Sequence, residues 1–298
     1  MTGDHHIGWL GTGRLGSAMA TRLLAHGVTM TVWNRTAPKT GPLIGLGATR
    51  AAAVGDLGRC DIVFTTVTSS ADLLAVTLGP GSVFRAQPAP RIVVDCSTVS
   101  AEAAAEVRAE AAKRGIAFLS APVSGNAGMI AQGHGSIIVS GAAKTFETVQ
   151  PYLRAIAPNV TYCGTGEAAL LTRLCHNLLL GMVGEVLAEV TTLAEKGGVA
   201  PSTFLDFIDE SVLGSTFIRH QGQAIRARNY EPTFTTESVR TDFDLGLAAA
   251  RQLEVPMPLA ATTHQLIQTA IGHGHGKSDF AVLYEVAARA AALPRTKR

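Results

Sequence analysis

The sequence predicts an α/β protein: an N-terminal domain with a doubly wound, mostly parallel sheet, followed by an all-α C-terminal domain with a long linking helix. Three observations support this prediction. Short apolar runs alternate with helix-like segments over the first half of the chain, and a glycine-rich motif follows the first run. Beyond residue 164 the strand signal ends, and apolar residues recur at helical spacing.

The length of the chain fits two domains. It has 298 residues, and one domain takes roughly 100–200. The pattern changes at Gly164-Thr165-Gly166, so we expect an N-terminal domain over residues 1–163 and a helical domain over residues 164–298. Hydrophobic residues make up 47% of the chain and charged residues 16%, which is enough apolar material for two cores.

The strands of the N-terminal domain are predicted where apolar and β-branched residues form short runs. These runs cover residues 7–10, 28–33, 61–65, 91–95, 116–119 and 136–139. Helices are expected over residues 17–25, which have an apolar face, and over the alanine-rich residues 101–114. Because the two kinds of element alternate, neighbouring strands are expected to be parallel.

The C-terminal domain is predicted to begin with one long helix over residues 167–197. A helix of about 30 residues is roughly 45 Å long, which exceeds a small domain, so we expect it to serve also as an interdomain or subunit interface. Further helices are predicted over residues 201–211, 217–227, 236–253, 259–271 and 280–292.

Composition and charge argue against several classes of protein. The formal net charge is +2 and no basic run is dense enough for a nucleic-acid or membrane surface. The start of the chain lacks the pattern of a signal peptide, and no stretch of about 18 residues is uniformly apolar. The four cysteines form no CxxC pair, so we expect a reduced, cytoplasmic setting. The His273-Gly274-His275-Gly276 segment has too few ligands for a metal, and no metal is expected.

The glycine motif predicts a dinucleotide site. Its residues are Gly11, Thr12, Gly13, Arg14, Leu15 and Gly16, which match GxGxxG between a strand and a helix. The first glycine permits the tight turn, the second lets the pyrophosphate approach the backbone, and the third lets helix and strand pack closely. The N-terminus of the following helix offers free N–H groups to the phosphates. These features indicate a Rossmann domain.

The end of the second strand indicates which dinucleotide binds. An NAD site usually has an acidic residue there, to bind the ribose hydroxyls. Here the segment is Asn34-Arg35-Thr36, which contains no carboxylate to repel a 2′-phosphate. Arg35 can pair with that phosphate, and Asn34 and Thr36 can hydrogen-bond to it. The sequence therefore favours NADP(H) over NAD(H).

Further motifs resemble one family over nearly the whole chain. They are Asp95-Cys96-Ser97-Thr98, Ala121-Pro122-Val123-Ser124-Gly125, Arg173-Leu174-Cys175-His176-Asn177 and Asp242-Phe243-Asp244-Leu245. In this order, and together with the glycine motif, they resemble the β-hydroxyacid dehydrogenases, which include 3-hydroxyisobutyrate dehydrogenase and 6-phosphogluconate dehydrogenase. The resemblance implies that a small substrate, expected to be a carboxylate, lies between the nicotinamide and the helical domain.

The resemblance also implies roles for individual residues. Ser97 and Thr98 would lie beside the nicotinamide and the substrate, although both can also be read as an N-cap of the next helix. Ser124 and Gly125 would hold the substrate carboxylate, and Asn126, where the family usually has glycine, would narrow or polarise that pocket. Asn177 would hydrogen-bond to the substrate. Cofactor contacts are also expected from Val67, Thr98 and Thr241.

The chain departs from the family at the catalytic lysine. That position is Arg173 here, four residues before Asn177, and a second family lysine is replaced by Thr241. An arginine does not readily exchange a proton, but it can polarise a carbonyl or stabilise an alkoxide. His176 shares a helix face with Arg173 and Asn177, so our hypothesis is that His176 or an ordered water transfers the proton. The alternative for His176 is a packing role.

These residues leave three functions open. The first is an NADP(H)-dependent oxidoreductase that interconverts a small β-hydroxyacid and a semialdehyde or keto acid. The second is an NADPH-dependent imine reductase, because those enzymes resemble this family, lack the lysine and show a similar Trp-Asn-Arg-Thr segment. The third is an NADP-binding protein without catalysis. A homodimer or homotetramer is expected in each case, because the apolar helical domain would leave exposed patches on a monomer.

Overall fold

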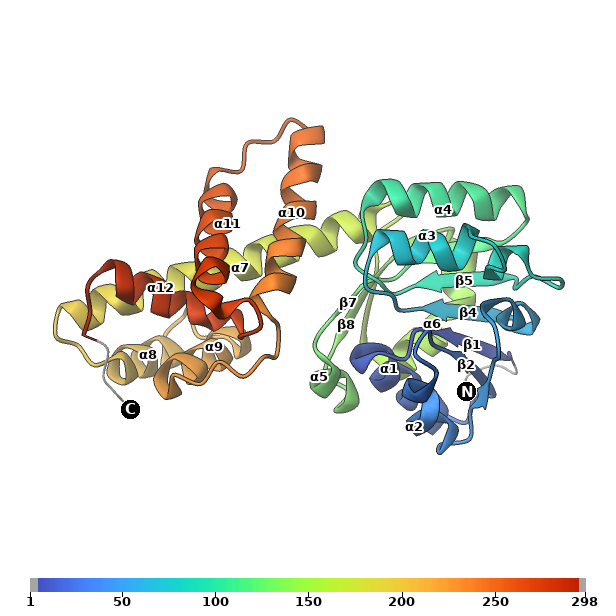
Figure 1. Cartoon of the computed structure of the whole chain (residues 1–298), viewed down its shortest axis with the longest axis horizontal. Helices are drawn as coiled ribbons and strands as arrows, with labels where there is room; N and C mark the ends of the chain where they lie inside the picture. The colour runs from blue at the N-terminus through green and yellow to red at the C-terminus, as the bar shows by residue number, and fades with distance from the viewer. Residues whose placement is uncertain (1–4, 295–298) are drawn as a thin grey trace. The chain divides into compact units, whose positions relative to one another are not determined.

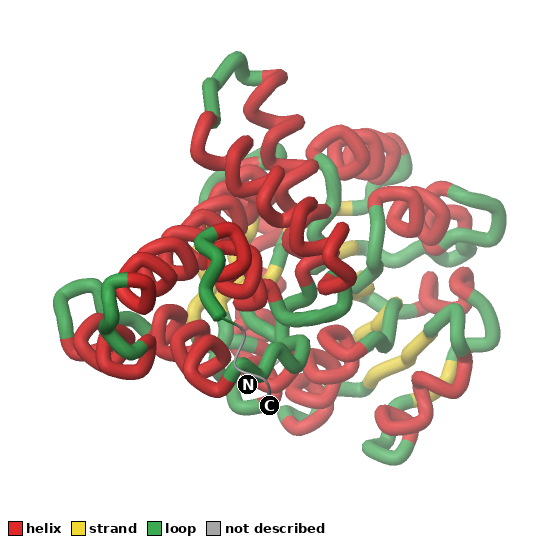
Figure 2. The backbone as a smooth tube through the Cα atoms, turned by 60° about the vertical axis from the view of Figure 1, so that its left-hand side comes forward, coloured by secondary structure: helices red, strands yellow, loops and turns green. Residues whose placement is uncertain are grey.

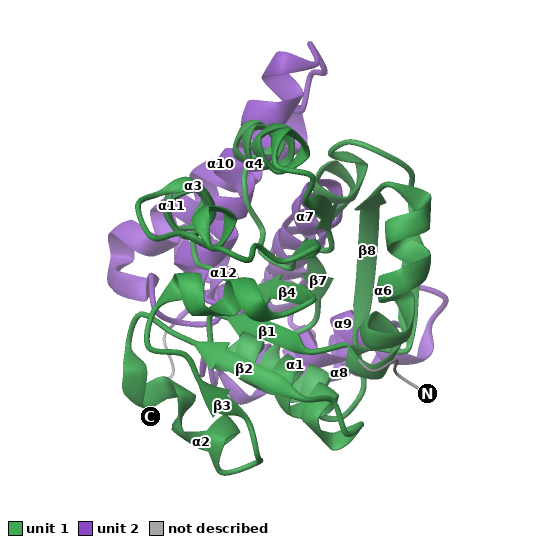
Figure 3. Ribbon diagram, turned by 90° about the vertical axis from the view of Figure 1, so that its right-hand side faces the viewer, with its two compact units in different colours: residues 1–173 green, residues 174–298 purple. Residues whose placement is uncertain are grey.

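The computed structural model describes residues 5–294 (Figure 1). The chain forms two compact units, Met1–Arg173 and Leu174–Arg298, shown in green and purple in Figure 3. The division falls after Arg173 rather than after residue 163, because the first turns of helix α7 (Ala168–Lys196) pack on the N-terminal unit. Leu170 belongs to the core of that unit, and the Ala169 N–H donates to Ser140 Oγ at 3.2 Å.

The N-terminal unit contains one nine-stranded sheet in the order β3-β2-β1-β4-β5-β6-β8-β7, with β9 paired to β8. The strands from β3 to β6 are parallel, β8 is antiparallel to β6 and β7, and β9 is parallel to β8. The doubly wound, mostly parallel sheet is therefore confirmed. Its strands are β1 (Ile7–Leu10), β2 (Met30–Trp33), β3 (Thr49–Arg50), β4 (Ile62–Thr65), β5 (Ile92–Asp95), β6 (Ala117–Ser120), β7 (Val123–Ser124), β8 (Ser136–Gly141) and β9 (Asn159–Tyr162).

Helices cover both faces of this sheet, which explains why its central strands are apolar on both sides. In β4, Ile62 and Phe64 pack into one core with α1 and α6, whereas Val63 packs into the other core with α3 and α4. Figure 1 shows these two helix pairs on opposite faces of the sheet. The helices are α1 (Arg14–Ala25), α2 (Gly41–Ile44), α3 (Ser70–Leu78), α4 (Ala101–Lys113), α5 (Ala127–Ala131) and α6 (Ala143–Ile156).

Three central strands end at the same edge of the sheet. Leu10, Thr65 and Asp95, the last residues of β1, β4 and β5, are register partners. The loops that follow them therefore leave side by side, and these loops carry the glycine motif, Val67 and Ser97-Thr98. In an open α/β sheet, ligands bind at the carboxyl ends of the strands, so this edge is where the site residues of the N-terminal unit are expected.

The C-terminal unit is helical, as Figure 2 shows, and its described residues contain no strand beyond an isolated bridge between Thr235 and Asp279. The all-α prediction is confirmed. Two glycines of α7 let aromatic rings approach its backbone: a Cβ on Gly181 would lie 2.3 Å from the Phe243 ring. The remaining helices are α8 (Pro201–Glu210), α9 (Thr216–Ala227), α10 (Thr236–Gln252), α11 (Pro258–Ala270) and α12 (Leu283–Ala290).

Helix α7 is long and apolar enough, by length and composition, to cross a membrane, which the sequence had not led us to expect. Its most apolar window has a mean hydropathy of 1.4, and half of that window is buried inside the structure. A core helix that is buried by its neighbours meets the same criterion, so α7 is weak evidence for a membrane span.

Candidate active site

The glycine loop has the three local properties that its motif predicted. Gly11 has a φ of +95°, and a Cβ there would lie 2.0 Å from the Thr66 carbonyl oxygen. A Cβ on Gly16 would lie 2.1 Å from the Gly11 carbonyl oxygen, so this glycine lets α1 pack against the loop. Nothing lies within 4 Å of a Cβ built on Gly13, so its backbone faces open space.

Two further observations show that this loop fits a dinucleotide. Helix α1 begins directly after Gly13 with no side-chain cap, which leaves its first N–H groups available to a phosphate. The hydroxyls of Thr12 and Thr66 are buried without a hydrogen-bond partner among the described residues. Such buried groups normally have partners, and a polar ligand at the loop would supply them.

The loop after β2 is tied to the glycine loop. Asn34 accepts a hydrogen bond from the Thr12 N–H at 2.9 Å and donates to the Thr36 carbonyl oxygen at 3.0 Å. The Asn34 side chain is therefore engaged within the protein, although the sequence had assigned it to the 2′-phosphate. Arg35 forms an ion pair with Asp72 at 2.9 Å. The segment itself contains no carboxylate, but the fold brings one to Arg35 from α3.

The ends of β4 and β5 are joined through the buried carboxyl of Asp95. Thr65 and Ser97 donate their hydroxyl protons to its Oδ1 at 2.6 and 2.7 Å. The Val67 N–H in turn donates to Ser97 Oγ at 2.8 Å. Burial raises the pKa of Asp95, and the hydrogen bonds from Thr65 and Ser97 oppose that shift. The Ser97 hydroxyl thus holds two strand ends together at the ligand-binding edge.

The residues after Ser97 correct one reading of the sequence. Helix α4 is capped by Ser100, whose Oγ accepts a hydrogen bond from the Ala103 N–H at 3.3 Å. Ser97 and Thr98 therefore do not cap this helix. Thr98 is half-buried in the loop that leaves the carboxyl edge of the sheet.

Arg173 lies against the segment expected to hold the substrate carboxylate. Its Nε donates to the Val123 carbonyl oxygen at 3.1 Å, directly before Ser124 and Gly125. Gly125 has a φ of +134°, which favours glycine. Asn126 caps α5 and accepts a hydrogen bond from the Met129 N–H at 2.9 Å. The fold thus brings the arginine at the lysine position to the proposed carboxylate site.

A buried pair in the C-terminal unit was only partly foreseen. Asn177 is 1% exposed, and its Nδ2 donates to Asp242 Oδ2 at 2.5 Å. The sequence indicated no individual role for Asp242, yet its buried carboxylate fixes the Asn177 amide. His176 is exposed, and its Nδ1 lies 3.0 Å from Asn177 Oδ1. Thr241 is also exposed and donates to the Glu237 carbonyl oxygen at 3.1 Å.

The histidine-rich segment continues α11 as a π-helical turn over Ile271–His275, in which Gly274 has a φ of +89°. Between residues 5 and 294, no group of three or more histidine, cysteine or acidic residues is placed to hold a metal ion. The structure therefore gives no support to a metal centre within the residues it describes.

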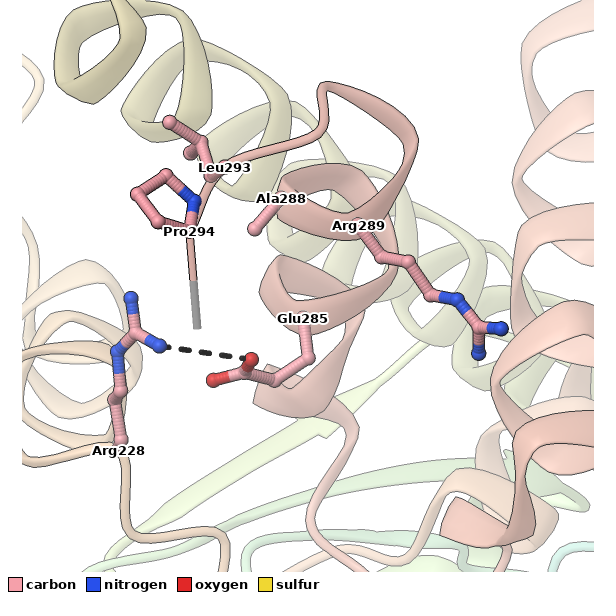
Figure 4. A pocket seen from close by; sticks show the side chains of 6 residues that line it. All are labelled: Arg228, Glu285, Ala288, Arg289, Leu293 and Pro294. Carbon is pink, nitrogen blue, oxygen red and sulfur yellow. Dashed lines mark ion pairs between the residues drawn. The ribbon is translucent and has the colours of Figure 1, made fainter. Parts of the chain in front are cut away.

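A hollow of about 340 Å³ lies in the C-terminal unit, and none of the residues singled out above lines it (Figure 4). Arg228 points toward Glu285 across it, with 3.8 Å between Nη1 and Oε2, and also lies 3.6 Å from Glu195. Its guanidinium stacks over the Tyr284 ring. Burial and the hydrogen bond to Glu195 raise the pKa of Tyr284 to about 12. These groups contact one another through ion pairs, a hydrogen bond and a ring contact, which is typical of a structural network.

Comparison with known proteins identifies the family. Residues 6–164 match the family described as the NAD binding domain of 6-phosphogluconate dehydrogenase. Residues 164–287 match the one described as NAD-binding of NADP-dependent 3-hydroxyisobutyrate dehydrogenase. The chain belongs to the β-hydroxyacid dehydrogenase family. The resemblance indicated by the motifs is confirmed, and the N-terminal unit is an NAD(P)-binding domain.

Two kinds of name are found among the curated relatives of this chain. Cytokine-like nuclear factor N-PAC of Mus musculus is 32% identical over 281 residues, which are 94% of this chain and 50% of the relative. The chain thus spans about half the length of that relative. Glyoxylate/succinic semialdehyde reductase 1 of Arabidopsis thaliana is 27% identical over 280 residues, which cover 94% of this chain and 97% of the relative.

Solved structures agree with the family. The 3-hydroxyisobutyrate dehydrogenase of Salmonella typhimurium is 27% identical, with a TM-score of 0.84, and the match covers 95% of this chain and 100% of that one. An imine reductase from Pseudomonas sp. has a TM-score of 0.61 at 19% identity, with coverage of 95% and 99%. At that identity the second likeness shows the fold alone.

Proposed function

We propose that this member of the β-hydroxyacid dehydrogenase family uses NADP(H) to interconvert a small β-hydroxyacid and the corresponding semialdehyde or keto acid. The observation that carries the proposal is the contact of Arg173 with β7, which places a guanidinium beside the Ser124-Gly125 segment. Glyoxylate and succinic semialdehyde, named in the Arabidopsis thaliana relative, each combine a carboxylate with an aldehyde. A site with a cation and backbone N–H groups suits such substrates.

The residues that would hold the cofactor come from three strand ends. The backbone of the glycine loop and the uncapped start of α1 would bind the pyrophosphate. Arg35 would pair with the 2′-phosphate of NADP(H), and the loops that carry Val67 and Thr98 would flank the nicotinamide half. The bound nicotinamide supplies or accepts the hydride. Thr241 stands where family members have a second lysine, and we propose it as a further cofactor contact.

Arg173 would stabilise charge on the reacting oxygen. A guanidinium remains protonated at neutral pH, so it stabilises a developing alkoxide electrostatically and does not exchange a proton with it. Its Nε donates to the Val123 carbonyl oxygen, which fixes the guanidinium near β7. Arg173 would thus perform the electrostatic part of the lysine's role and leave the proton transfer to another group.

His176 is the proposed partner in proton transfer, either directly or through an ordered water. It lies three residues after Arg173 on the continuous helix α7, so the two share a helix face. Its Nδ1 lies 3.0 Å from Asn177 Oδ1, and Asp242 fixes the Asn177 amide. Asn177 would then orient both the imidazole and the substrate hydroxyl.

An imine reductase is the second candidate. One reason is that Arg173 replaces the family's lysine, because a protonated imine needs less help from an acid than a carbonyl does. The other is the Trp33-Asn34-Arg35-Thr36 segment, which resembles that of imine reductases. The third candidate, an NADP-binding protein without catalysis, rests on both missing lysines. The name of the N-PAC relative states no reaction, which is compatible with that candidate.

A substrate panel separates these candidates. The protein is incubated with NADPH and either glyoxylate, succinic semialdehyde or a cyclic imine, and the loss of NADPH absorbance is followed. We expect turnover of an aldehyde. Turnover of the imine alone would support the second candidate, and nucleotide binding without any turnover would support the third. NADH in place of NADPH tests the cofactor preference in the same assay.

We further propose a cytoplasmic location and a homodimer or homotetramer.

A further inference from the structure

The ion pair between Arg35 and Asp72 lies at the expected adenosine end of the cofactor site. Arg35 follows β2, and Asp72 lies in the first turn of α3, which follows β4. Because β2 and β4 are the two neighbours of β1, the ion pair crosses the end of β1, where the glycine loop begins. In doubly wound folds the dinucleotide binds at this place, with its adenosine ribose near the end of β2.

The Asp72 carboxylate is fixed on both oxygens. Its Oδ1 accepts a hydrogen bond from Arg35 Nη1 at 2.9 Å, and its Oδ2 accepts one from Ser69 Oγ at 3.0 Å. The Asp72 N–H donates back to Ser69 Oγ at 3.1 Å, as a helix cap. The carboxylate therefore stays at this place even when Arg35 moves.

The Arg35 side chain is far more exposed than that of Asp72. The Arg35 side chain is 79% exposed and that of Asp72 is 28% exposed. Exposed ion pairs are weak, so Arg35 can turn toward a phosphate without a large loss. The fixed carboxylate would then lie near a phosphate that carries between one and two negative charges. The two anions repel each other, and NAD(H), which has no 2′-phosphate, escapes this repulsion.

We propose that Asp72 is a specificity-determining residue that weakens the preference of this site for a 2′-phosphate. The proposal rests on the proposed role of Arg35 in NADP(H) binding. Without Asp72 the local charge at the end of β2 would be that of Arg35 alone. With Asp72 the pair is neutral, so the site distinguishes NADP(H) from NAD(H) less strongly than the Asn34-Arg35-Thr36 segment suggests.

The test uses two nucleotide fragments that differ only in the 2′-phosphate. The full-length protein is titrated calorimetrically with adenosine 2′,5′-bisphosphate and with adenosine 5′-monophosphate, before and after Asp72→Asn. We expect the variant to bind the bisphosphate about three- to tenfold more tightly, which is the size of one unpaired charge interaction near a surface. Its affinity for the monophosphate should not change.

Asp61→Asn is the matched control. Asp61 forms an ion pair of the same type with Arg91 at 2.7 Å, at the opposite end of β4, with side-chain exposures of 72% for Arg91 and 34% for Asp61. This control should leave both affinities unchanged. Arg35→Gln should weaken the binding of the bisphosphate and leave the binding of the monophosphate unchanged. If Arg35→Gln does not weaken bisphosphate binding, that result contradicts the proposed function of Arg35, whatever Asp72→Asn shows.

Two results would overturn the role of Asp72. One is an unchanged ratio of the two affinities in Asp72→Asn. The other is weaker binding of the bisphosphate, which would show that Asp72 orients Arg35 for the phosphate instead of opposing it. Circular dichroism of each variant verifies folding.

Discussion

At the residue scale, the two units each contain a buried carboxyl group with a raised pKa, and the two differ in their partners. Asp95 receives three hydrogen bonds on one oxygen, from Thr65 and Ser97. Glu185, on α7, is 5% exposed, and its Oε2 has no partner among the described residues. Asp95 therefore organises the ligand-binding edge of the sheet, whereas Glu185 is an unpaired acid within the helical unit.

Glu185 makes the stability of the protein depend on pH. Burial, with a smaller contribution from Glu189, raises its pKa from 4.5 to about 7. Between these values the folded chain retains a proton that the unfolded chain releases, so stability falls as pH rises from about 4.5 to about 7. Glu185→Gln should remove this loss and stabilise the protein by up to about 3 kcal/mol at pH 8, with little effect at pH 5.

Urea unfolding at the two pH values measures this effect. The matched control is Glu210→Gln, because Glu210 is exposed in the same unit and does not contribute to the raised pKa of Glu185. Equal stabilisation by Glu185→Gln at both pH values would contradict a titration of Glu185, and no stabilisation at pH 8 would contradict its raised pKa.

The proton-transfer role of His176 is tested by its replacement. His176→Ala should lower kcat for aldehyde reduction by about 10²- to 10⁴-fold, which is typical for the loss of a general acid. The KM for the aldehyde should change little. His273→Ala replaces another exposed histidine of the same unit and serves as the control. Unchanged turnover in His176→Ala would leave this residue with a packing role.

At the scale of the elements, the sequence predicted best those strands that helices bury on both faces. Ile7–Leu10 matches β1, and residues 167–197 match α7 to within one residue at each end. Helix α6 was missed, because its interior contains Pro151, which normally interrupts a helix. Strands β3 and β7 have two residues each, which is too short to show the sequence pattern of a strand. They form because a neighbouring strand pairs with them.

The candidate site shows the same difference between features that local sequence patterns predict and features that depend on the tertiary fold. The sequence located its loops, because glycine spacing and polar residues after strands are local features. It could not predict that Asp72 meets Arg35 or that Asp242 meets Asn177, because these contacts join residues 37 and 65 positions apart. Only the tertiary fold brings such pairs together.

The glycine loop gives a prediction about the β1–α1 connection. Gly13→Ala should fold with an unchanged melting temperature, because nothing lies within 4 Å of the added Cβ. It should bind NADPH at least about tenfold more weakly, because the methyl group would occupy the space of the pyrophosphate. Gly11→Ala should instead destabilise the fold, since its Cβ would clash with the Thr66 carbonyl. Thermal unfolding and NADPH titration of both variants distinguish the two effects, and normal NADPH affinity in a folded Gly13→Ala would contradict the assigned role.

At the scale of the whole molecule, exposed apolar side chains on α7 support the proposed oligomer. Leu179, Val186 and Leu193 are 59%, 56% and 73% exposed, and they recur every seven residues, so they form one stripe along the helix. Large exposed apolar surfaces normally mark interfaces. The proposed homodimer or homotetramer would cover this stripe.

Light scattering after size-exclusion chromatography tests the interface. Leu193→Glu should convert the assembly into a smaller species, because it places a charge on the stripe. Leu253→Glu alters a leucine that is 59% exposed outside α7 and should leave the mass unchanged. A monomeric wild type, or an assembly that Leu193→Glu leaves intact, would contradict the proposal.

The central claim is that Arg173 stabilises the reacting oxygen in the place of the family's lysine. Its most direct test is kcat/KM for NADPH-dependent aldehyde reduction by wild type, Arg173→Lys and Arg173→Ala. We predict an active wild type, a loss of about 10²- to 10³-fold in Arg173→Ala, the usual cost of one such electrostatic contact, and activity retained or increased in Arg173→Lys. Equal activity of wild type and Arg173→Ala would contradict the claim, as would an inert wild type that becomes active only with lysine.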